Sequence, residues 1–378
     1  MQRCRAFVVL LLTLAPALAQ ADDALQSFLQ QTLVIARDKS HIPGMAALIQ
    51  IDGHIAAKAA VGVRALGHPE PVTIDDRWHI GSDTKAFTST LIARLVEQRV
   101  FGFDDTLALS FPSFAREMDS AYRDVTVTQL LSHTAGLPPL TDDADLPSFL
   151  AVLRSANGVM AQRTALARHY LSQPPASKRG EYEYSNLGYI IAGAIAESHT
   201  GQPWEALVRE EVFVPLGITH AGFGAPGTAG RLDQPWGHQE INGQLVPLDP
   251  GDSDADNPPA LGPAGTMNIT LEDWMRFAQD QLDGVAGHGK LLKPETYRKL
   301  HTPVAGVYAL GWGVKLDPDG TPSILTHDGS NGYWLADIRI MPKHQIITLV
   351  VMNCGNAAAS EALRAINKSL RDRLKPFD

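Results

Sequence analysis

The spacing of apolar residues changes twice along this chain of 378 residues. Residues 45–51 and 55–63 are apolar segments separated by Asp52-Gly53, a pair typical of hairpin turns, so they predict two adjacent strands. Short segments with a strand-like pattern return after about residue 304. The strands predicted there are residues 310–316, 323–327, 333–341 and 345–352.

Between these two regions the apolar positions recur at the helical period of three to four residues. The helices predicted in the middle of the chain are residues 159–172, 187–200, 203–213 and 271–282. A further helix is predicted to close at Gly136, within the segment 130–137. Residues 23–39 and 357–374 are also helical in pattern. The strands thus lie near both ends and the helices mostly between them.

This distribution indicates one sheet built from both ends of the chain. Short links between consecutive strands, such as Pro342-Lys343-His344, favour antiparallel pairing. We therefore predict an α/β plus all-α fold. Residues 22–103 and 304–378 form a mainly antiparallel sheet flanked by the N- and C-terminal helices, and residues 104–303 form a large, mostly helical insertion.

The first 21 residues have the pattern of a secretory signal. Two arginines precede an apolar run at residues 7–14, and small residues offer cleavage after Ala19 or Ala21. The run is too short for a stable membrane-spanning helix. We predict a secreted or periplasmic protein with no membrane span after cleavage; the alternative is that the segment is retained as an N-terminal anchor.

Charge and cysteine content narrow the functional classes. Without residues 1–21 the chain has 30 Lys and Arg against 41 Asp and Glu, a net charge of −11, which argues against nucleic acid as a partner. Cys354 is then the only cysteine, so no internal disulfide can form. Because it ends an apolar run, we expect a packed thiol rather than a nucleophile.

Candidate chemistry begins at Ser82 and Lys85, which form an S-x-x-K pattern at the start of a predicted helix. Ser82 would lie in the first helical turn and Lys85 one turn later on the same face. A serine hydroxyl needs a base beside it to become a nucleophile, and a lysine whose pKa is lowered can be that base. The alternative is that Ser82 caps the helix and Lys85 lies on the surface.

Tyr184 and Asn186 form the only Y-x-N pattern in the chain, just before the predicted helix 187–200. A protonated lysine nearby would favour the phenolate of Tyr184, which could then act as a base. Asn186 could donate or accept hydrogen bonds with Lys85 or with a substrate carbonyl. Alternatively, Asn186 caps the helix and Tyr184 only packs.

A third group follows the predicted strand 323–327 and contains His327, Gly329 and Ser330. A glycine on a strand lets another backbone approach closely. The N–H of Ser330 could then pair with that of Ser82 as an oxyanion hole, and His327 would face the substrate. The alternative is an ordinary polar loop.

No metal site or cofactor is expected. The acidic segment 252–257 resembles a calcium loop only superficially, because its glycine is missing and Pro263 stands where a bidentate Glu should be, so a solvated loop is predicted. The sequence has no H-E-x-x-H motif and no G-x-S-x-G elbow. These absences disfavour a metal hydrolase and a hydrolase with the Ser-His-Asp triad.

The order of these three groups resembles the signatures of the serine β-lactamase and penicillin-binding-protein superfamily, most closely the class C β-lactamase-related group of esterases and D-amino-acid peptidases. The segments 130–137, 184–189, 263–266 and 310–313 are similar to that group as well. The resemblance implies an α/β domain beside a helical domain, with the active site in the cleft between them.

The resemblance also implies roles for the matching residues. Ser82 would be acylated, Lys85 and Tyr184 would share the proton transfers, and Asn186 would position Lys85 and the substrate. The backbones of Ser82 and Ser330 would bind the oxyanion. His327 stands where β-lactamases of the family have the lysine of K-T-G. A histidine is mostly neutral near pH 7, so a substrate carboxylate would lose a cationic partner.

We therefore expect a serine hydrolase that acts on a small-molecule or peptide substrate with an ester or amide bond. A D-amino-acid peptidase resembling DD-carboxypeptidases and an esterase compete closely, and a β-lactamase proper is the alternative. A non-catalytic protein that binds penicillin or cell-wall fragments is an alternative of another class. The sequence leaves the oligomeric state open.

Overall fold

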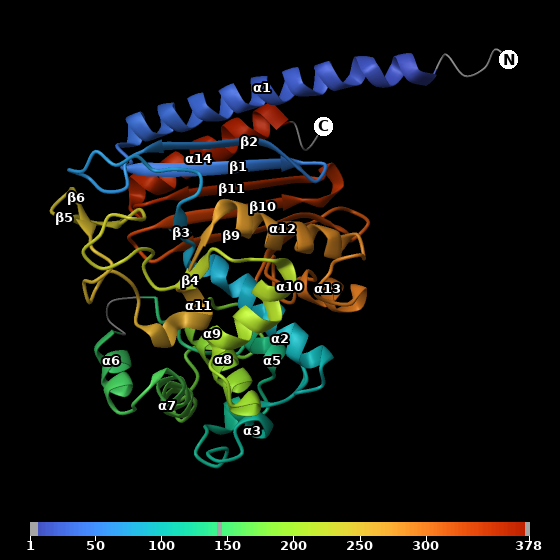
Figure 1. Cartoon of the computed structure of the whole chain (residues 1–378). Helices are drawn as coiled ribbons and strands as arrows, with labels where there is room; N and C mark the ends of the chain where they lie inside the picture. Colours follow the sequence, from blue (N-terminus) through green and yellow to red (C-terminus); the bar gives the residue numbers. More distant parts are fainter. Residues whose placement is uncertain (1–6, 142–145, 375–378) are drawn as a thin grey trace.

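The computed structural model describes residues 7–141 and 146–374, with side chains described from residue 23 onward (Figure 1). The predicted signal cleavage sites therefore lie outside the described side chains. Among the described residues, no helix combines the length and the apolar character needed to cross a membrane.

The core of the fold is a six-stranded antiparallel sheet in the order β2-β1-β11-β10-β9-β8. Its strands are β1 (Gly44–Ile51), β2 (His54–Gly62), β8 (Gly313–Leu316), β9 (Pro322–Ser330), β10 (Leu335–Met341) and β11 (Ile346–Met352). The pairing of β1 with β11 joins the two ends of the chain, as predicted. The β1–β2 turn is the expected one, because Asp52 and Gly53 both have positive φ.

One face of the sheet is covered by α1 (Phe7–Ser40) and α14 (Ala357–Leu374); in Figure 1, α1 lies above the strands and α14 passes behind them. Leu29 and Leu33 of α1 and Ile366 of α14 are buried against this face. Cys354 is buried in the same cluster, where burial raises the pKa of its thiol to about 12. It is therefore a packed thiol, as predicted.

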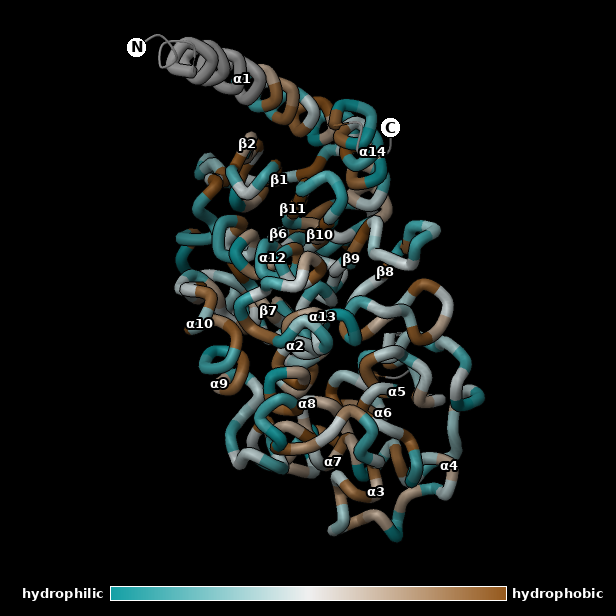
Figure 2. Tube along the Cα trace, turned by 90° about the vertical axis from the view of Figure 1, so that its right-hand side faces the viewer, coloured by the Kyte–Doolittle hydropathy of each residue, from teal (hydrophilic) through white to brown (hydrophobic). Residues whose placement is uncertain are grey.

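The other face carries α12 (Leu271–Val285) and α2 (Thr84–Glu97), with the helical layer beyond them (Figure 1). Figure 2 shows hydrophobic residues gathered along β10 and β11, between the two layers of helices. Helix α8 (Asn186–Thr200), which is buried from Leu187 to Glu197, is at the centre of the helical layer, and Gly201 ends it in the left-handed conformation.

Shorter elements complete the chain. The remaining helices are α3 (Leu107–Ser110), α4 (Ser120–Arg123), α5 (Val127–Leu131), α6 (Leu146–Arg154), α7 (Val159–Leu171), α9 (Trp204–Val208), α10 (Val214–Leu216), α11 (Gly262–Gly265) and α13 (Pro294–Leu300). A small sheet has the order β3-β7-β4, and a separate hairpin joins β5 to β6. These strands are β3 (Arg77–His79), β4 (Ala221–Phe223), β5 (Gly237–Ile241), β6 (Gln244–Leu248) and β7 (Met267–Thr270).

Several predicted boundaries are wrong. The strand expected at residues 323–327 continues to Ser330, so the third candidate group lies within β9 rather than after it. The helix expected to close at Gly136 already ends at Leu131, and a loop follows in which His133 and Gly136 have positive φ. The strand expected from residue 310 begins at Gly313, because Gly311 turns the chain at φ 83°. A Cβ on Gly311 would lie 2.8 Å from the Lys85 carbonyl oxygen, so this turn packs directly on α2.

Candidate active site

Ser82 lies in a tight turn, Gly81–Asp83, that connects β3 to α2. The α-helix itself begins at Thr84, so the prediction that Ser82 lies in its first turn is wrong by two residues. The turn is tight because Gly81 has φ 49° and lies against β9, where an added Cβ would come within 2.7 Å of the Gly329 carbonyl carbon. Lys85 still follows one turn later and on the same side.

The side chain of Lys85 is completely buried and makes three hydrogen bonds. Its Nζ lies 2.8 Å from Asn186 Oδ1, 2.7 Å from the Ala264 carbonyl oxygen and 3.0 Å from Ser82 Oγ. Burial holds the pKa of this amine well below its usual value, against the opposing influence of Asp83. A neutral amine has two N–H donors for the two carbonyl acceptors, which leaves its lone pair facing the Ser82 hydroxyl.

Tyr184 contacts the other side of the same hydroxyl, and its O–H donates to Ser82 Oγ at 2.8 Å. Burial raises the pKa of Tyr184, which keeps it a phenol. The predicted phenolate is therefore corrected for the free protein: the lysine beside Tyr184 is itself pushed toward neutrality and, before a reaction begins, does not stabilise an anion there. Ser82 Oγ can thus accept one hydrogen bond from Tyr184 while it donates its proton to Lys85.

Asn186 is the first residue of α8, and Ser185 caps the helix by accepting from the N–H of Gly188. The interpretation of Asn186 as a cap is therefore wrong. Its amide instead bridges two segments, because Nδ2 donates to the Leu140 carbonyl at 2.9 Å while Oδ1 accepts from Lys85. The first of these bonds fixes which end of the amide faces the lysine.

The Ala264 carbonyl is held in place by contacts of α11 with α2 and α8. Thr88 Oγ1 donates to the neighbouring Pro263 carbonyl at 2.7 Å. Gly193 of α8 allows the Pro263 ring to pack closely, since a Cβ there would overlap it. The residues just before α11 are fixed by the buried Arg163 of α7. Its guanidinium donates to the carbonyl oxygens of Pro259 and Ala260, at 2.8 and 3.1 Å.

The third predicted group reaches the site through its backbone. Gly329 is buried against the turn that carries the serine, and a Cβ there would lie 2.8 Å from the Ser82 amide nitrogen. This close approach of β9 was expected from the glycine. The Ser330 hydroxyl is turned away, because it donates to the Trp334 carbonyl at 2.6 Å. The Ser330 backbone is thus the part of that residue nearest Ser82.

The imidazole of His327 does not line the pocket over Ser82. Its Nδ1 lies 2.8 Å from the Asp328 carbonyl and must donate to it, so Nε2 accepts from the Tyr308 hydroxyl at 2.9 Å. Burial, with a smaller effect of Lys85, lowers the pKa of His327 to about 4. The side chain is neutral, and it is not among the described side chains that line the pocket over Ser82.

Two residues whose rings pack beside the site, His133 and Tyr308, were not predicted from the sequence as site residues. His133, whose Nδ1 accepts from the Ser185 N–H at 3.0 Å, packs its ring 4.4 Å from that of Tyr184 and 4.6 Å from that of Tyr308. Together they support the phenol of Tyr184. The segment 130–137 was noted as the end of a helix and for its similarity to the family, and no local pattern identifies Tyr308.

Above Ser82 lies a pocket of about 650 Å³. One side is apolar and is lined by Leu140, Leu146, Phe149, Leu150 and Leu261. The other side is polar and includes Asp254, Asp256, Asn257 and Asn331. The segment 252–257 was predicted as a solvated loop, and this holds only for its first half: Asp256 is partly buried and accepts from Asn331 Nδ2 at 2.8 Å.

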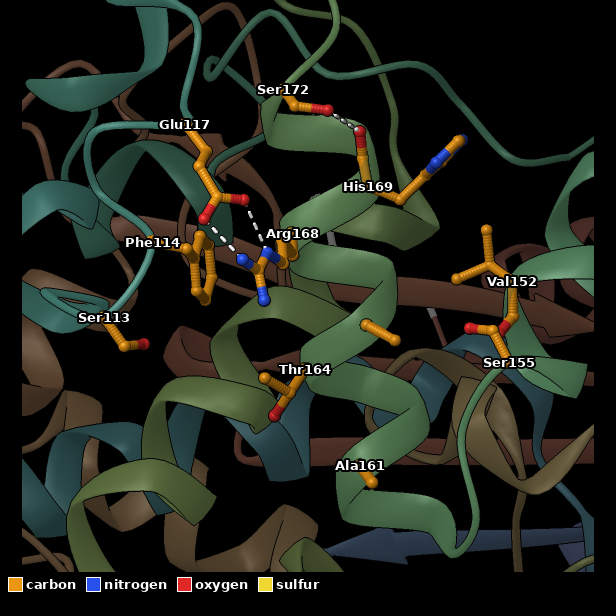
Figure 3. A pocket seen from close by; sticks show the side chains of 11 residues that line it. Ser113, Phe114, Glu117, Val152, Ser155, Ala161, Thr164, Arg168, His169 and Ser172 are labelled. Atoms are coloured by element: carbon orange, nitrogen blue, oxygen red, sulfur yellow. Dashed lines mark hydrogen bonds and ion pairs between the residues drawn. The ribbon is translucent and has the colours of Figure 1, made fainter.

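A second hollow, of about 680 Å³, lies beside α7 and is shown in Figure 3. Its charged side chains, Glu117 and Arg168, are exposed and paired with each other. None of the predicted site residues lines it. Among the residues that the structure describes, no group of three or more His, Cys, Asp or Glu side chains is arranged to hold a metal ion.

Comparison with known proteins identifies the family. The chain is 31% identical to penicillin-binding protein 4 of Amycolatopsis lactamdurans over 344 residues, which cover 87% of this chain and 86% of that protein. Its fold is similar to that of EstCE1, a hydrolase with promiscuous acyltransferase activity (TM-score 0.76, 20% identity, 93% of this chain and 99% of that chain).

A D-alanine carboxypeptidase AmpC from Burkholderia cenocepacia is also similar in structure, with a TM-score of 0.68 and 21% identity over 92% of this chain and 99% of that chain. The model of the Beta-lactamase family matches residues 21–371, which is nearly the whole sequence. The antiparallel sheet and the helical layer agree with this match, and the chain belongs to the Beta-lactamase family.

Proposed function

We propose that this protein is a serine hydrolase that works through an acyl-enzyme on Ser82. The observation that carries the proposal is the position of Ser82 Oγ, 3.0 Å from the Lys85 amine and 2.8 Å from the Tyr184 hydroxyl. Ser82 is only partly buried and lines the pocket, whereas Lys85 is fully buried below it. A nucleophile therefore faces the substrate space while its base is shielded from water.

The geometry supports a sequence of balanced proton transfers. Lys85 accepts the Ser82 proton as Oγ bonds to the substrate carbonyl carbon, and the carbonyl oxygen becomes an anion beside the Ser82 and Ser330 amides. When the tetrahedral intermediate collapses, the bond to the leaving group breaks and Tyr184 donates its proton to that group. The Lys85 ammonium, with Nζ 4.8 Å from the centre of the Tyr184 ring, stabilises the phenolate and restores its proton.

Hydrolysis of the acyl-enzyme reverses these roles. Water attacks the ester carbonyl on Ser82 while the Lys85–Tyr184 pair accepts its proton, and Ser82 leaves as an alcohol. Asn186 keeps Lys85 in place through both halves of the reaction, because its amide is anchored on the Leu140 carbonyl.

The substrate is proposed to be an ester or an amide, in the manner of an esterase or a D-amino-acid peptidase. A protein resembling DD-carboxypeptidases and a β-lactamase proper would both bind a substrate carboxylate. The neutral, buried His327 offers that carboxylate no cation, so the esterase and the peptidase of D-amino-acid amides and esters are favoured. Export by the N-terminal signal remains a prediction.

The proposal is tested by labelling the purified protein with a fluorophosphonate and locating the adduct by mass spectrometry. We expect one adduct, on the peptide that contains Ser82, and none in Ser82→Ala. A stable adduct with penicillin but no turnover of p-nitrophenyl esters or D-alanyl peptides would favour the non-catalytic binding protein. Absence of any Ser82 adduct would contradict the proposal.

A further inference from the structure

We infer that the pocket over Ser82 takes substrates with an apolar group beside the scissile bond and rejects substrates that carry a carboxylate on either side of that bond. The inference rests on the proposed function and adds to it the chemical class of the substrate. It follows from how the two sides of the pocket differ and from where the cations of this region lie.

The apolar lining residues of the pocket include four leucines and one phenylalanine. Phe149 is buried, whereas Leu146 remains 44% exposed although both line the pocket. A hydrocarbon group that covers such a side chain removes apolar surface from water, which contributes about 25 cal/mol per Å². This side of the pocket therefore favours an aliphatic or aromatic group over a small or polar one.

The polar side is held in a fixed geometry by a chain of hydrogen bonds that begins next to the serine. The Gly81 N–H donates to His79 Nδ1 at 3.1 Å, so Nδ1 is an acceptor and the ring N–H is on Nε2. That proton is directed at Asp256 Oδ2, 3.0 Å away, and Asp256 Oδ1 accepts from Asn331. The carboxylate of Asp256 is thus part of the wall rather than a mobile surface charge.

No cation among the described lining residues balances this side. Among the described residues that line the pocket there is no Lys, Arg or His, whereas Asp254 and Asp256 are both present. Residues 142–145, which lie outside the described structure, contain no Lys or Arg in the sequence. Lys85 lies below Ser82 with its hydrogen-bonding capacity used by three partners, and His327 bonds to Tyr308.

A substrate carboxylate would therefore lose water next to like charges and gain no counter-ion. Leaving a charge desolvated and unpaired is strongly unfavourable, and like-charge contacts are a common way to exclude a wrong ligand. A neutral or cationic group meets no such penalty. The pocket thus discriminates by charge on its polar side and by apolar contact on the other.

Three chromogenic esters test the inference: p-nitrophenyl butyrate, mono-p-nitrophenyl adipate and 3-carboxy-4-nitrophenyl butyrate. The second carries a carboxylate on the acyl group and the third carries one on the leaving group. After each kcat/KM is divided by the ester's own rate of hydroxide hydrolysis, we expect the neutral ester to be preferred by about tenfold or more. Equal values for either charged ester would overturn the inference.

Variants connect the preference to the pocket. Asp254→Lys should raise the ratio of kcat/KM for each charged ester to that for the neutral ester by about threefold or more. Asp104→Lys makes the same charge change at an exposed residue that does not line the pocket, and it should have no such effect. If both variants act alike, the discrimination comes from overall charge and the inference about the pocket is wrong.

Fluorophosphonate labelling and ester kinetics on the same protein samples distinguish a failure of this inference from a failure of the proposed function. A fluorophosphonate adduct on Ser82 together with equal use of charged and neutral esters would leave the serine mechanism standing and remove only the charge selectivity. No adduct on Ser82 would remove both.

Discussion

The pocket over Ser82 and the hollow beside α7 have similar volumes, about 650 and 680 Å³, but their polar side chains differ in burial and in protonation state. In the hollow, Glu117 and Arg168 are exposed and compensate each other, which leaves both in their ordinary charged forms (Figure 3). Beneath the pocket, burial pushes Lys85 toward neutrality and keeps Tyr184 a phenol. Reactive groups are recognised by shifted pKa values and convergent hydrogen bonds, whereas volume alone does not distinguish the two cavities.

The largest difference between the two cavities should appear on removal of a serine hydroxyl. We expect Ser82→Ala to lower kcat/KM by about 10⁴-fold or more, because the acyl-enzyme cannot form. Ser113→Ala removes a hydroxyl from the hollow and is the matched control, with unchanged turnover expected. Steady-state kinetics on an ester substrate measure both. Substantial activity in Ser82→Ala would mean that another group carries the acyl fragment.

Removal of the buried base comes next. Lys85→Ala should lower kcat by about 10²–10⁴, the usual range for lost acid–base catalysis, whereas Arg168→Ala in the hollow should leave it unchanged. In the wild type, kcat/KM should fall as the pH falls through the lowered pKa of Lys85, because only the neutral amine accepts a proton. If the activity that remains in Lys85→Ala shows the same decrease at low pH, the ionisation that causes this decrease belongs to another group.

A smaller effect on kcat/KM is expected from a substitution of Tyr308, the residue whose hydroxyl is hydrogen-bonded to His327. Tyr308→Phe removes the hydrogen bond to His327 Nε2 but keeps the ring that packs on His133. Since neither Tyr308 nor His327 lines the pocket, we expect kcat/KM to fall by only about twofold to tenfold. A loss comparable to that of Lys85→Ala would show that this pair takes part directly in proton transfer.

The last comparison concerns stability rather than rate. Asp83 is buried without a hydrogen-bond partner for either carboxylate oxygen, and burial, reinforced by Asp328 and Asp337, raises its pKa well above the usual value. The folded state therefore binds a proton that the unfolded chain loses above about pH 4, so this residue costs stability as the pH rises from there toward its folded pKa.

Asp83→Asn removes this cost because an amide has no proton to lose. We expect its melting temperature to exceed that of the wild type at pH 7 and the difference to shrink as the pH approaches 4. Glu117→Gln, in the exposed pair of the hollow, should show no such gain. Thermal unfolding followed by circular dichroism at several pH values measures the effect, and a gain that does not depend on pH would contradict the assignment of a protonated Asp83.

Much of the fold was predictable because local patterns encode it. The hairpin at Asp52-Gly53, the strands that return after residue 304 and the terminal helices follow from turn chemistry and apolar periodicity. The boundaries that were wrong lie where a tertiary contact decides them. The turn at Ser82 is tight because β9 presses against Gly81, and β8 starts late because Gly311 packs on α2.

The sequence alone identified the candidate groups of the proposed active site: a serine and a lysine three residues apart, a Y-x-N before a buried helix, and a glycine that lets β9 come close. Only the tertiary structure decided their states. Burial lowers the pKa of Lys85, and one of the acceptors that fix its amine is Ala264, 179 residues away. The partner of His327 Nε2 is the Tyr308 hydroxyl. Protonation and orientation depend on burial and on long-range contacts, and no local pattern of residues contains that information.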